Sequence, residues 1–537
     1  MAVIASVLLG LASAAPAARI VPAPRLLGLR VDNGSTPFAG DRRLLTTVSP
    51  NGDGFRDRAI VRFRLTAPAT VRLDVVRTDS IKRAAAFAET ISSQTIRLGR
   101  GPHRLVWRPL GDTSNRTYVL RLIVTGRNGA RRVYGLPRPG FSPRVIAPVV
   151  RVLGIAASFL RDSYAPGESA DVSVSTDARS LRFQVFTLGK IAHPTQSDLR
   201  TGGEAMTPPV TLAWKAHRNA PNLVRVVRAG DWPSGLYFLR MTANDGRVGY
   251  APFILRPRGV GAHRVAVVLA TNTWQAYNFD DADGDGWGDS WYVSSAFRTI
   301  DLRRPYLDFG VPFRFRDWDL TFVSWLTTTR KEVDFLSDDD LARFKSGDAL
   351  ARAYDLVVFP GHEEYVTQHV YDVLRRYRDL GGNLLFLSAN NLFWKVVRRG
   401  PYLTRVAEWR RLGRPEASLV GVQFDAGDYG RRQAPFTVTG AASEPWVFAG
   451  TGLENGDGFG AYGYEIDKRS RASPRSVHVL ARIPNLMGAG RTAEMTYYET
   501  ARGAKVFAAG ALNFAASADQ PVVSRLLENV WARLSGP

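Results

Sequence analysis

The chain has 537 residues, 45% of them hydrophobic and 11% aromatic, so it can bury several cores and should divide into several domains. It contains no cysteine, which excludes disulfides, thiolate metal sites and a cysteine nucleophile. The formal net charge of +22 favours polyanions, but the arginines form no basic tract interleaved with aromatic residues, so no nucleic-acid partner is expected.

Residues 1–18 predict a secretory signal. An apolar run from Val3 to Leu11 precedes the small residues Ala12-Ser13-Ala14, a pattern that signal peptidase accepts. Because no lysine or arginine stands near Met1, a membrane anchor or a misplaced start codon is the alternative. No later segment is apolar for long enough to cross a bilayer. We therefore expect a secreted or envelope-associated protein whose mature chain has no transmembrane segment.

Residues 25–146 and 147–258 predict two β-sandwich domains. Apolar and polar residues alternate in Ala59–Leu65 and again in Ala170–Ser175, as in strands with one buried face. The run Ser49–Asp57 resembles the start of immunoglobulin-like modules found beside many secreted bacterial enzymes. Neither domain has a convergent acid/base set, so we expect them to serve in spacing, docking or covering an active site.

Residues 263–537 predict an α/β domain with a mainly parallel sheet, because short apolar strands alternate with helical segments. Between the third and fourth of these strands, apolar residues at helical spacing precede Gly381-Gly382, as at the end of a helix. The topology would suit a glutamine-amidotransferase-like fold. The predicted strands are Val265–Ala270, Leu320–Ser324, Leu356–Phe359 and Leu384–Leu387.

Polar motifs directly follow three of these strands. They are Asn272–Asn278, Gly361–Tyr365 and Ser388–Asn391. The loops after the carboxyl ends of parallel strands line the binding crevice of an open sheet. We therefore expect the three motifs to converge on one site.

The residue types at this predicted site restrict its chemistry. Amidotransferase chemistry needs a cysteine at a nucleophile elbow, and no Gly-x-Ser-x-Gly elbow is visible either. The candidate side chains are His362, Glu363, Glu364, Tyr277, Tyr292 and Asn390. Carboxylate and phenolate oxygens, as this set contains, suit a Lewis-acidic ferric ion that activates a bound water. The alternatives are structural: His362 as a helix cap, the two tyrosines as half-buried loop aromatics, and Asn390 as a turn residue.

The motifs also occur in the order that is typical of one family. The C-terminal half of the chain resembles the catalytic domain of the N,N-dimethylformamidase beta (large) subunit family. The matching motifs are Asn272-Thr-Trp-Gln-Ala-Tyr-Asn278, Ser290-Trp-Tyr292, Gly361-His-Glu-Glu-Tyr365, Gly381–Asn391 with Phe393-Trp394, and Tyr497-Tyr-Glu-Thr500.

This resemblance implies a mononuclear non-haem iron held by two tyrosinates and one carboxylate. Matched residue by residue, the metal ligands are Tyr277, Tyr292 and Glu364, and the catalytic or substrate-pocket residues are His362, Asn390 and Glu499. The implied reaction is hydrolysis of the C–N bond of a small linear amide. His362 or Glu499 would move a proton to the departing amine, and Asn390 would orient the substrate oxygen.

Two departures from the family pattern stand out. Glu363 replaces the usual proline, and an acidic segment replaces a glycine-rich connection between the two tyrosines. Within this segment Asp281, Asp283, Asp285 and Asp289 have the spacing of a calcium loop, but Tyr292 stands where an EF-hand has its bidentate glutamate. The alternatives are a Ca²⁺ site that fixes the position of Tyr292 and a solvated acidic turn.

A second function from another class remains open. The same fold could be a non-catalytic secreted protein that binds a cell-envelope polymer or carbohydrate by ring stacking. The candidate rings are Trp274, Trp287, Trp291, Phe393 and Trp394. The expected partners are therefore a small amide or an envelope polymer, and an oligomer is compatible with the sequence.

Overall fold

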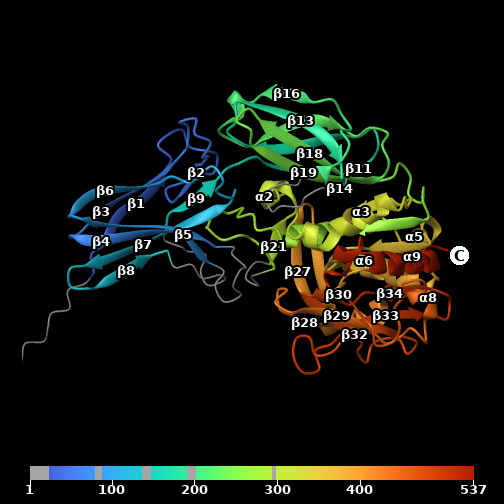
Figure 1. Ribbon diagram of the computed structural model, residues 1–537. Helices are drawn as coiled ribbons and strands as arrows, with labels where there is room; N and C mark the ends of the chain where they lie inside the picture. Colours follow the sequence, from blue (N-terminus) through green and yellow to red (C-terminus); the bar gives the residue numbers. More distant parts are fainter. Residues whose placement is uncertain are drawn as a thin grey trace, which may run out of the picture.

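The computed structural model describes residues 23–78, 88–135, 147–188, 190–191, 201–292 and 298–536, and it shows three units in chain order (Figure 1). The protein is multidomain and mostly β-sheet. The predicted signal at residues 1–18 lies outside the described residues. No helix in the described ranges is long and apolar enough to cross a membrane.

The first unit consists of two sheets that share one hydrophobic core. One sheet has the order β1 (Leu26–Asp32), β3 (Ala59–Leu65), β6 (Gly101–Trp107). The other has the order β2 (Leu45–Val48), β9 (Val149–Val152), β7 (Thr117–Gly126), β4 (Ala69–Arg77), β5 (Glu89–Leu98), with β8 (Arg131–Tyr134) beside β7. Because β9 pairs with β2 and β7, the first unit extends past the predicted boundary at residue 146.

The second unit also packs two sheets around one core. The smaller sheet has the order β10 (Ala156–Phe159), β12 (Ser169–Ser175), β17 (Asn222–Arg228). The larger sheet has the order β11 (Ser163–Tyr164), β19 (Val248–Leu255), β18 (Gly235–Ala243), β13 (Ser180–Thr187), β16 (Val210–Ala213). A separate hairpin pairs β14 (Lys190–Ile191) with β15 (Thr201–Gly202).

The third unit is built on one nine-stranded sheet. Its order is β22 (Asp334–Ser337), β20 (Val265–Leu269), β23 (Leu356–Phe359), β25 (Asn383–Phe386), β34 (Lys505–Ala508), β33 (Ala493–Glu499), β32 (His478–Ile483), β29 (Gln433–Val438), β30 (Gly458–Gly463). The pairs from β22 to β34 are parallel, and those from β34 to β30 are antiparallel. The sheet is therefore mixed, which corrects the prediction of a mainly parallel sheet.

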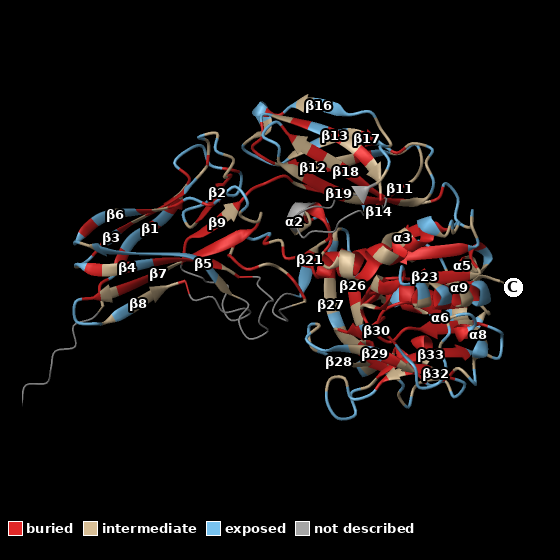
Figure 2. Cartoon of the chain, viewed as in Figure 1, coloured by how far each residue is buried: buried red, intermediate tan, exposed pale blue. Residues whose placement is uncertain are grey.

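Both faces of the parallel half are covered. Alternate residues of β20 enter different cores, since Val267 packs with α3 (Thr321–Thr328) and α9 (Pro521–Ser535), whereas Val268 packs with α5 (Gly347–Ala353) and α6 (Gln368–Asp379). All residues of β20, β22, β23 and β25 are buried, and Figure 2 shows β23 in red, in contrast to the partly exposed strands of the first unit. Burial on both faces explains why these strands are continuously apolar in sequence.

One predicted strand is wrong. Residues 320–324 belong to a helical segment, a π-helical turn at Arg316–Leu320 that continues into α3. Trp318, Phe322 and Trp325 are all buried and recur at helical spacing, so burial at this spacing determines the structure here. The strand that pairs with β20 on this side is β22, which the periodicity did not predict.

Smaller elements complete the third unit. A four-stranded sheet has the order β21 (Thr299–Asp301), β27 (Tyr402–Glu408), β26 (Trp394–Arg399), β24 (Tyr365–Thr367), and β28 (Gln423–Gly427) pairs with β31 (Glu465–Lys468). The remaining α-helices in the described ranges are α1 (Thr271–Ala276), α2 (Leu307–Gly310), α4 (Asp338–Ala342), α7 (Ala417–Val420) and α8 (Pro445–Phe448).

Candidate metal centre

Tyr277 stands at the end of α1, directly after β20. The start of this helix is fixed by Asp338, whose carboxylate accepts a hydrogen bond from the backbone N–H of Asn272 at 2.7 Å. Tyr277 is the C-cap residue of α1 and is only 3% exposed. The short helix therefore carries the tyrosine from the carboxyl end of a central strand into the interior.

The loop after β23 contributes His362 and Glu364. Glycine is required at position 361, because a Cβ atom there would lie 2.0 Å from Oδ1 of the buried Asp319. The backbone N–H of Glu364 donates to the hydroxyl of Thr273 in α1 at 3.2 Å. This bond ties the loop to the helix that ends at Tyr277.

Asn390, in the loop after β25, connects two glutamates. Its side-chain N–H group donates to Glu364 at 3.3 Å and to Glu465 at 2.8 Å. Its backbone has φ +55°, a left-handed conformation that asparagine tolerates better than most residues, and its own N–H donates to Asp467 at 2.8 Å. The asparagine is therefore held on both its backbone and its side chain.

These residues form one group, which we call the tyrosine–glutamate cluster: Tyr277, His362, Glu364 and Asn390, which are buried, and Glu465, which is partly buried. The Tyr277 hydroxyl donates to Oε2 of Glu364. Nε2 of His362 lies 3.4 Å from Oε2 of Glu465 and 3.9 Å from Oε2 of Glu364. The predicted convergence of three strand-end motifs is therefore present in the structure.

Burial controls the protonation of the cluster. It raises the pKa of Glu364 to about 7 and, together with the charge of Glu364, raises the pKa of Glu465 well above its usual range. Burial also raises the pKa of the Tyr277 hydroxyl and lowers the pKa of His362 to about 3. The imidazole is therefore neutral at physiological pH, although it lies at ion-pair distance from two carboxyl groups.

Several polar atoms of the cluster have no hydrogen-bond partner within the described ranges. Both ring nitrogens of His362 and Oδ1 of Asn390 are buried in this state. Buried polar groups in native proteins are nearly always paired, so unpaired groups gathered at one place indicate a ligand or an ion. The contact between a phenol and a carboxylate in the same cluster supplies the hard oxygen donors that a ferric ion prefers.

Tyr292 lies beside the cluster. Its ring centroid is 4.9 Å from that of Tyr277 and 5.1 Å from that of Phe313. The Ser290 hydroxyl connects the two tyrosines, because it donates to the Tyr277 carbonyl at 3.1 Å and accepts from the Tyr292 N–H at 3.3 Å. The second predicted tyrosine ligand is thus adjacent to the first.

Glu499 is not part of this cluster, contrary to the sequence-based assignment. It is the last residue of β33, which runs antiparallel to β34, and it pairs with Lys505 at the start of that strand. This end of the sheet is opposite the loops that follow β23 and β25. The Glu499 side chain is exposed and binds Arg533 at 2.8 Å and the hydroxyl of Tyr497.

Glu465 occupies the place that the sequence analysis gave to Glu499. It belongs to β31, a strand of a two-stranded antiparallel ribbon, so it does not follow a strand of the main sheet. Asp467, on the same strand, holds the backbone of Asn390. No spacing rule connects this ribbon to the strand-end loops, and only the tertiary structure reveals these two residues.

The acidic segment brings together three of its four predicted calcium ligands. Carboxylate oxygens of Asp281, Asp283 and Asp285 lie within 4.8 Å of one another. Asp289 is not in this group, and its carboxylate accepts from the N–H of Ala282 at 3.2 Å. Burial raises the pKa of Asp289 to about 7 and that of Asp285 to about 6.

The rings expected to stack on a carbohydrate are mostly inaccessible. Trp274, Trp287 and Trp291 are 5%, 7% and 5% exposed. Phe393 and Trp394 are half-buried, and an arginine already covers each of them: Arg410 over Phe393 at 4.8 Å and Arg405 over Trp394 at 4.8 Å. These five rings therefore do not form an open surface for sugar stacking.

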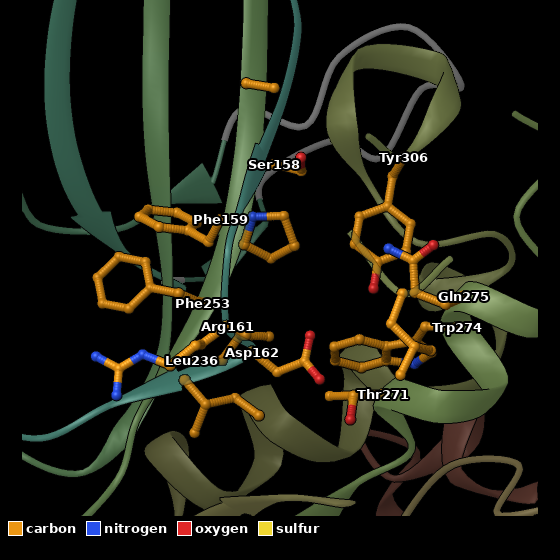
Figure 3. A pocket seen from close by; sticks show the side chains of 14 residues that line it. Ser158, Phe159, Arg161, Asp162, Leu236, Phe253, Thr271, Trp274, Gln275 and Tyr306 are labelled. Carbon is orange, nitrogen blue, oxygen red and sulfur yellow. The ribbon is translucent and has the colours of Figure 1, made fainter. Parts of the chain in front are cut away.

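A crevice of about 410 Å³, partly open to solvent, lies between the second unit and α1. Figure 3 shows the Asp162 carboxylate on the same side as Trp274 and Tyr306, and the guanidinium of Arg161 on the other side. No residue of the tyrosine–glutamate cluster lines this crevice. It is therefore distinct from the candidate metal centre.

The fold and the site define a multidomain, mostly β protein with a buried phenol, carboxylate and imidazole cluster at the strand ends of its third unit. Residues 220–525 match the family described as "N,N-dimethylformamidase beta subunit-like, C-terminal". The chain belongs to this family. The match begins within the second unit and includes the whole cluster.

Two relatives carry the name N,N-dimethylformamidase beta subunit. The protein from Paracoccus aminophilus is 27% identical over 168 residues, which are 30% of this chain and 21% of the relative. The protein from Alcaligenes sp is 28% identical over 171 residues, 31% of this chain and 21% of the relative. The matched segment spans about a fifth of the length of either relative.

Among solved structures, this chain is similar to trypsin-activated alpha-2-macroglobulin from Escherichia coli, with 11% identity and a TM-score of 0.23. That match covers 43% of this chain and 16% of the other. The native conformation of E. coli alpha-2-macroglobulin gives a TM-score of 0.22 over the same shares. Similarity at this level carries no argument about function.

Proposed function

We propose that this protein is a metal-dependent hydrolase of C–N amide bonds and acts on small linear amides. The observation that carries the proposal is the tyrosine–glutamate cluster, in which phenol, carboxylate, imidazole and amide groups converge in a buried place. Membership of the dimethylformamidase beta subunit-like family supports the hydrolase class. The likeness to a glutamine-amidotransferase fold stays a prediction, supported by the parallel half of the main sheet.

Tyr277, Tyr292 and Glu364 would hold the metal, which we propose to be Fe³⁺. All three side chains offer oxygen donors, and Tyr277 and Glu364 are already in contact. Deprotonation of a phenol whose pKa is raised by burial requires a nearby positive charge, which a trivalent cation supplies. When bound, such an ion would polarise the amide carbonyl and lower the pKa of water.

His362 and Glu465 would move protons during the reaction. Because burial raises its pKa, Glu465 is protonated and can donate its proton to the departing amine. The neutral imidazole of His362, 3.4 Å away, can relay a proton from the attacking water back to Glu465. Asn390 orients Glu364 and Glu465 through its amide N–H group, while its unpaired Oδ1 is available to a substrate. Burial of Tyr277, His362, Glu364 and Asn390 limits the access of bulk water to these groups.

Four further parts of the proposal concern the setting of the enzyme. The apolar N-terminal run supports export, with location outside the cell or at the envelope. The relatives' names describe them as subunits, which supports assembly into an oligomer. Ca²⁺ binding by Asp281, Asp283 and Asp285 stays a prediction, as does the immunoglobulin-like character of the first unit.

The test is release of amine from a panel of small amides, including N,N-dimethylformamide, by the iron-loaded full chain. Wild-type protein should hydrolyse at least one amide of the panel, and Glu465→Gln should be about 100-fold or more slower, because proton transfer contributes factors of this size. Glu499→Gln is the matched control and should keep wild-type activity. Equal loss in both variants, or activity retained by Glu465→Gln, would refute the assignment.

The alternative of a non-catalytic envelope-binding protein rests on the net charge of +22 rather than on the rings. It predicts binding to an anionic polymer that weakens as salt is added. An iron-free, inactive wild-type protein that binds such a polymer would favour this function over the hydrolase.

A further inference from the structure

The segment between the two tyrosines forms a closed loop, which we call the tyrosine loop (residues 277–292). Its ends are joined, because the Trp291 N–H donates to the Ala276 carbonyl at 2.7 Å and the Ser290 hydroxyl donates to the Tyr277 carbonyl. The two tyrosines therefore stand at the base of one loop with its ends together.

The inside of the tyrosine loop is held by Arg304, which is 4% exposed. Its guanidinium donates to the carbonyl oxygens of Asp280 and Asp289, at 3.2 and 3.0 Å, and to that of Gln275 in α1 at 2.5 Å. These bonds connect both sides of the loop, at Asp280 and at Asp289, to the helix that carries Tyr277. A displacement of the loop tip would therefore also move the two tyrosines at the base of the loop.

The tip of the tyrosine loop is inserted into the first unit. Arg42 donates to the carbonyl oxygens of Asp283 and Gly284, at 2.9 and 3.0 Å, and Thr78, just after β4, donates to that of Gly286 at 2.5 Å. The contact leaves no room for side chains. A Cβ atom on Gly284 would lie 2.5 Å from Leu45, and one on Gly286 would lie 2.5 Å from Val119.

We propose that the first unit is a positioning element of the metal centre: through Thr78 and Arg42 it clamps the tip of the tyrosine loop and so places Tyr292 against Tyr277. The inference rests on the proposed role of Tyr292 as a ligand. It gives a chemical role to a domain outside the family match, which begins at residue 220. It also explains the glycines of the segment, since only a tip without side chains at 284 and 286 fits against β2 and β7.

Gly286→Val in the full chain tests the clamp, because the new side chain would collide with Val119 in β7. Gly246→Val is the matched control: Gly246 has a similar left-handed backbone, φ +87° against +95°, but nothing lies within 4 Å of its added Cβ. Thr78→Val removes one clamping hydrogen bond, and Thr78→Ser restores it. The threonine pair keeps the test informative if Gly286→Val fails to fold.

The first readout needs no metal. Hydrogen exchange followed by mass spectrometry should show faster exchange of peptides covering Trp291 and Tyr292 in Gly286→Val and Thr78→Val than in wild type, Gly246→Val and Thr78→Ser. Unchanged exchange in both clamp variants would overturn the inference, whatever the protein binds.

The second readout is iron content together with the visible absorption of an iron–phenolate centre. The clamp variants should bind iron about tenfold or more weakly, the usual cost of losing groups that orient a ligand, and their absorption band should shift. An identical band and iron content in Gly286→Val would also contradict the clamp. Wild type that binds no iron would instead refute the proposed function, and the exchange data would then decide the clamp alone.

Discussion

Replacement of Asn390 can distinguish the effect of its left-handed backbone from the effect of its side-chain amide. Its backbone has φ +55°, so alanine would add strain while removing the amide, whereas glycine removes the amide without strain. Asn390→Gly and Asn390→Ala should both lose about 100-fold or more of the amide-hydrolysis kcat, because Glu364 and Glu465 would lose their common donor.

The measurement is steady-state kinetics of both variants on one amide, with iron content as the control. If Asn390→Gly keeps wild-type kcat while Asn390→Ala does not, the residue supplies only a left-handed backbone. The role of its amide in holding the two glutamates would then be refuted.

The sequence predicted that residues on loops after parallel strands lie close together, and the structure brings these residues together. His362, Glu364 and Asn390 were predictable because each stands a few residues beyond the end of a neighbouring strand in the sheet. Glu465 was not predictable, because antiparallel pairing of β31 with β28 brings it to the site. Glu499 was assigned from a local motif match, and the antiparallel direction of β33 places it at the opposite end of the sheet.

At the scale of elements, the segment from Arg316 to Thr328 contains a buried carboxyl group that should make stability depend on pH. Asp319 is 1% exposed and its Oδ1 has no partner within the described residues. Burial raises its pKa to about 7. The folded state therefore binds this proton more tightly than the unfolded state does.

The sign follows from this difference in proton binding. Between about pH 4 and pH 7, the unfolded state has lost this proton and the folded state still holds it. Each rise of one pH unit in this range therefore lowers the unfolding free energy by about 1.4 kcal/mol. Asn at this position does not titrate. Asp319→Asn should therefore resemble wild type in urea unfolding near pH 4 and be more stable at pH 8, and an equal or lower stability at pH 8 would refute the explanation.

The same segment shows why the helix was predicted as a strand. The run Leu320–Ser324 is short and apolar, and periodicity alone does not distinguish a strand from a buried helical turn in so few residues. Trp318 and Trp325, on either side of the run, are buried in two different cores of the third unit, and the run between them is helical.

Calcium binding by the tyrosine loop is tested at the same scale. If Asp281, Asp283 and Asp285 bind Ca²⁺, millimolar calcium should raise the Tm of the wild-type chain, and Asp283→Asn should abolish the rise, because binding to the folded state stabilises it. Asp289→Asn, outside the group, should keep most of the rise. No calcium effect on wild type would assign the loop to its alternative, an acidic turn.

At the scale of the whole molecule, an ion pair of the second unit, Arg247 with Asp177, binds Ser49 of the first unit. Arg247, in the second unit, donates to Ser49 of the first unit at 2.8 Å and to Asp177 at 2.8 Å. The side chain of Asp177 is fully buried. Loss of the arginine would therefore leave the buried Asp177 carboxylate without a cationic partner, bound only by the Ser49 hydroxyl at 2.7 Å.

Arg247→Ala should lower the unfolding free energy by about 3 kcal/mol or more, the usual cost of breaking a buried pair. Arg225→Ala, which breaks an exposed pair with Asp171, is the matched control and should leave the unfolding free energy close to that of wild type. Thermal or urea unfolding of both variants gives the comparison. Equal losses in the two variants would show that the pair of Arg247 with Asp177 contributes no more to the unfolding free energy than an exposed pair does.

Composition and strand patterns predicted the division into two β units and a third unit, but not how the units meet. The first unit extends to β9, beyond residue 146, because that strand pairs with distant β2 and β7. The contact between this unit and the tyrosine loop is carried by glycines and backbone carbonyls, which leave no hydrophobic pattern in the sequence. Such contacts become visible only in three dimensions.

The central claim is that Tyr277 and Glu364 hold a metal, and elemental analysis with the visible spectrum of the purified full chain tests it most directly. Wild-type protein from iron-replete cells should contain close to one iron per chain and show a phenolate absorption band, and both should be lost in Tyr277→Phe with Glu364→Gln. Glu499→Gln should match wild type. Wild-type protein without iron, or iron retained in the double variant, would contradict the account.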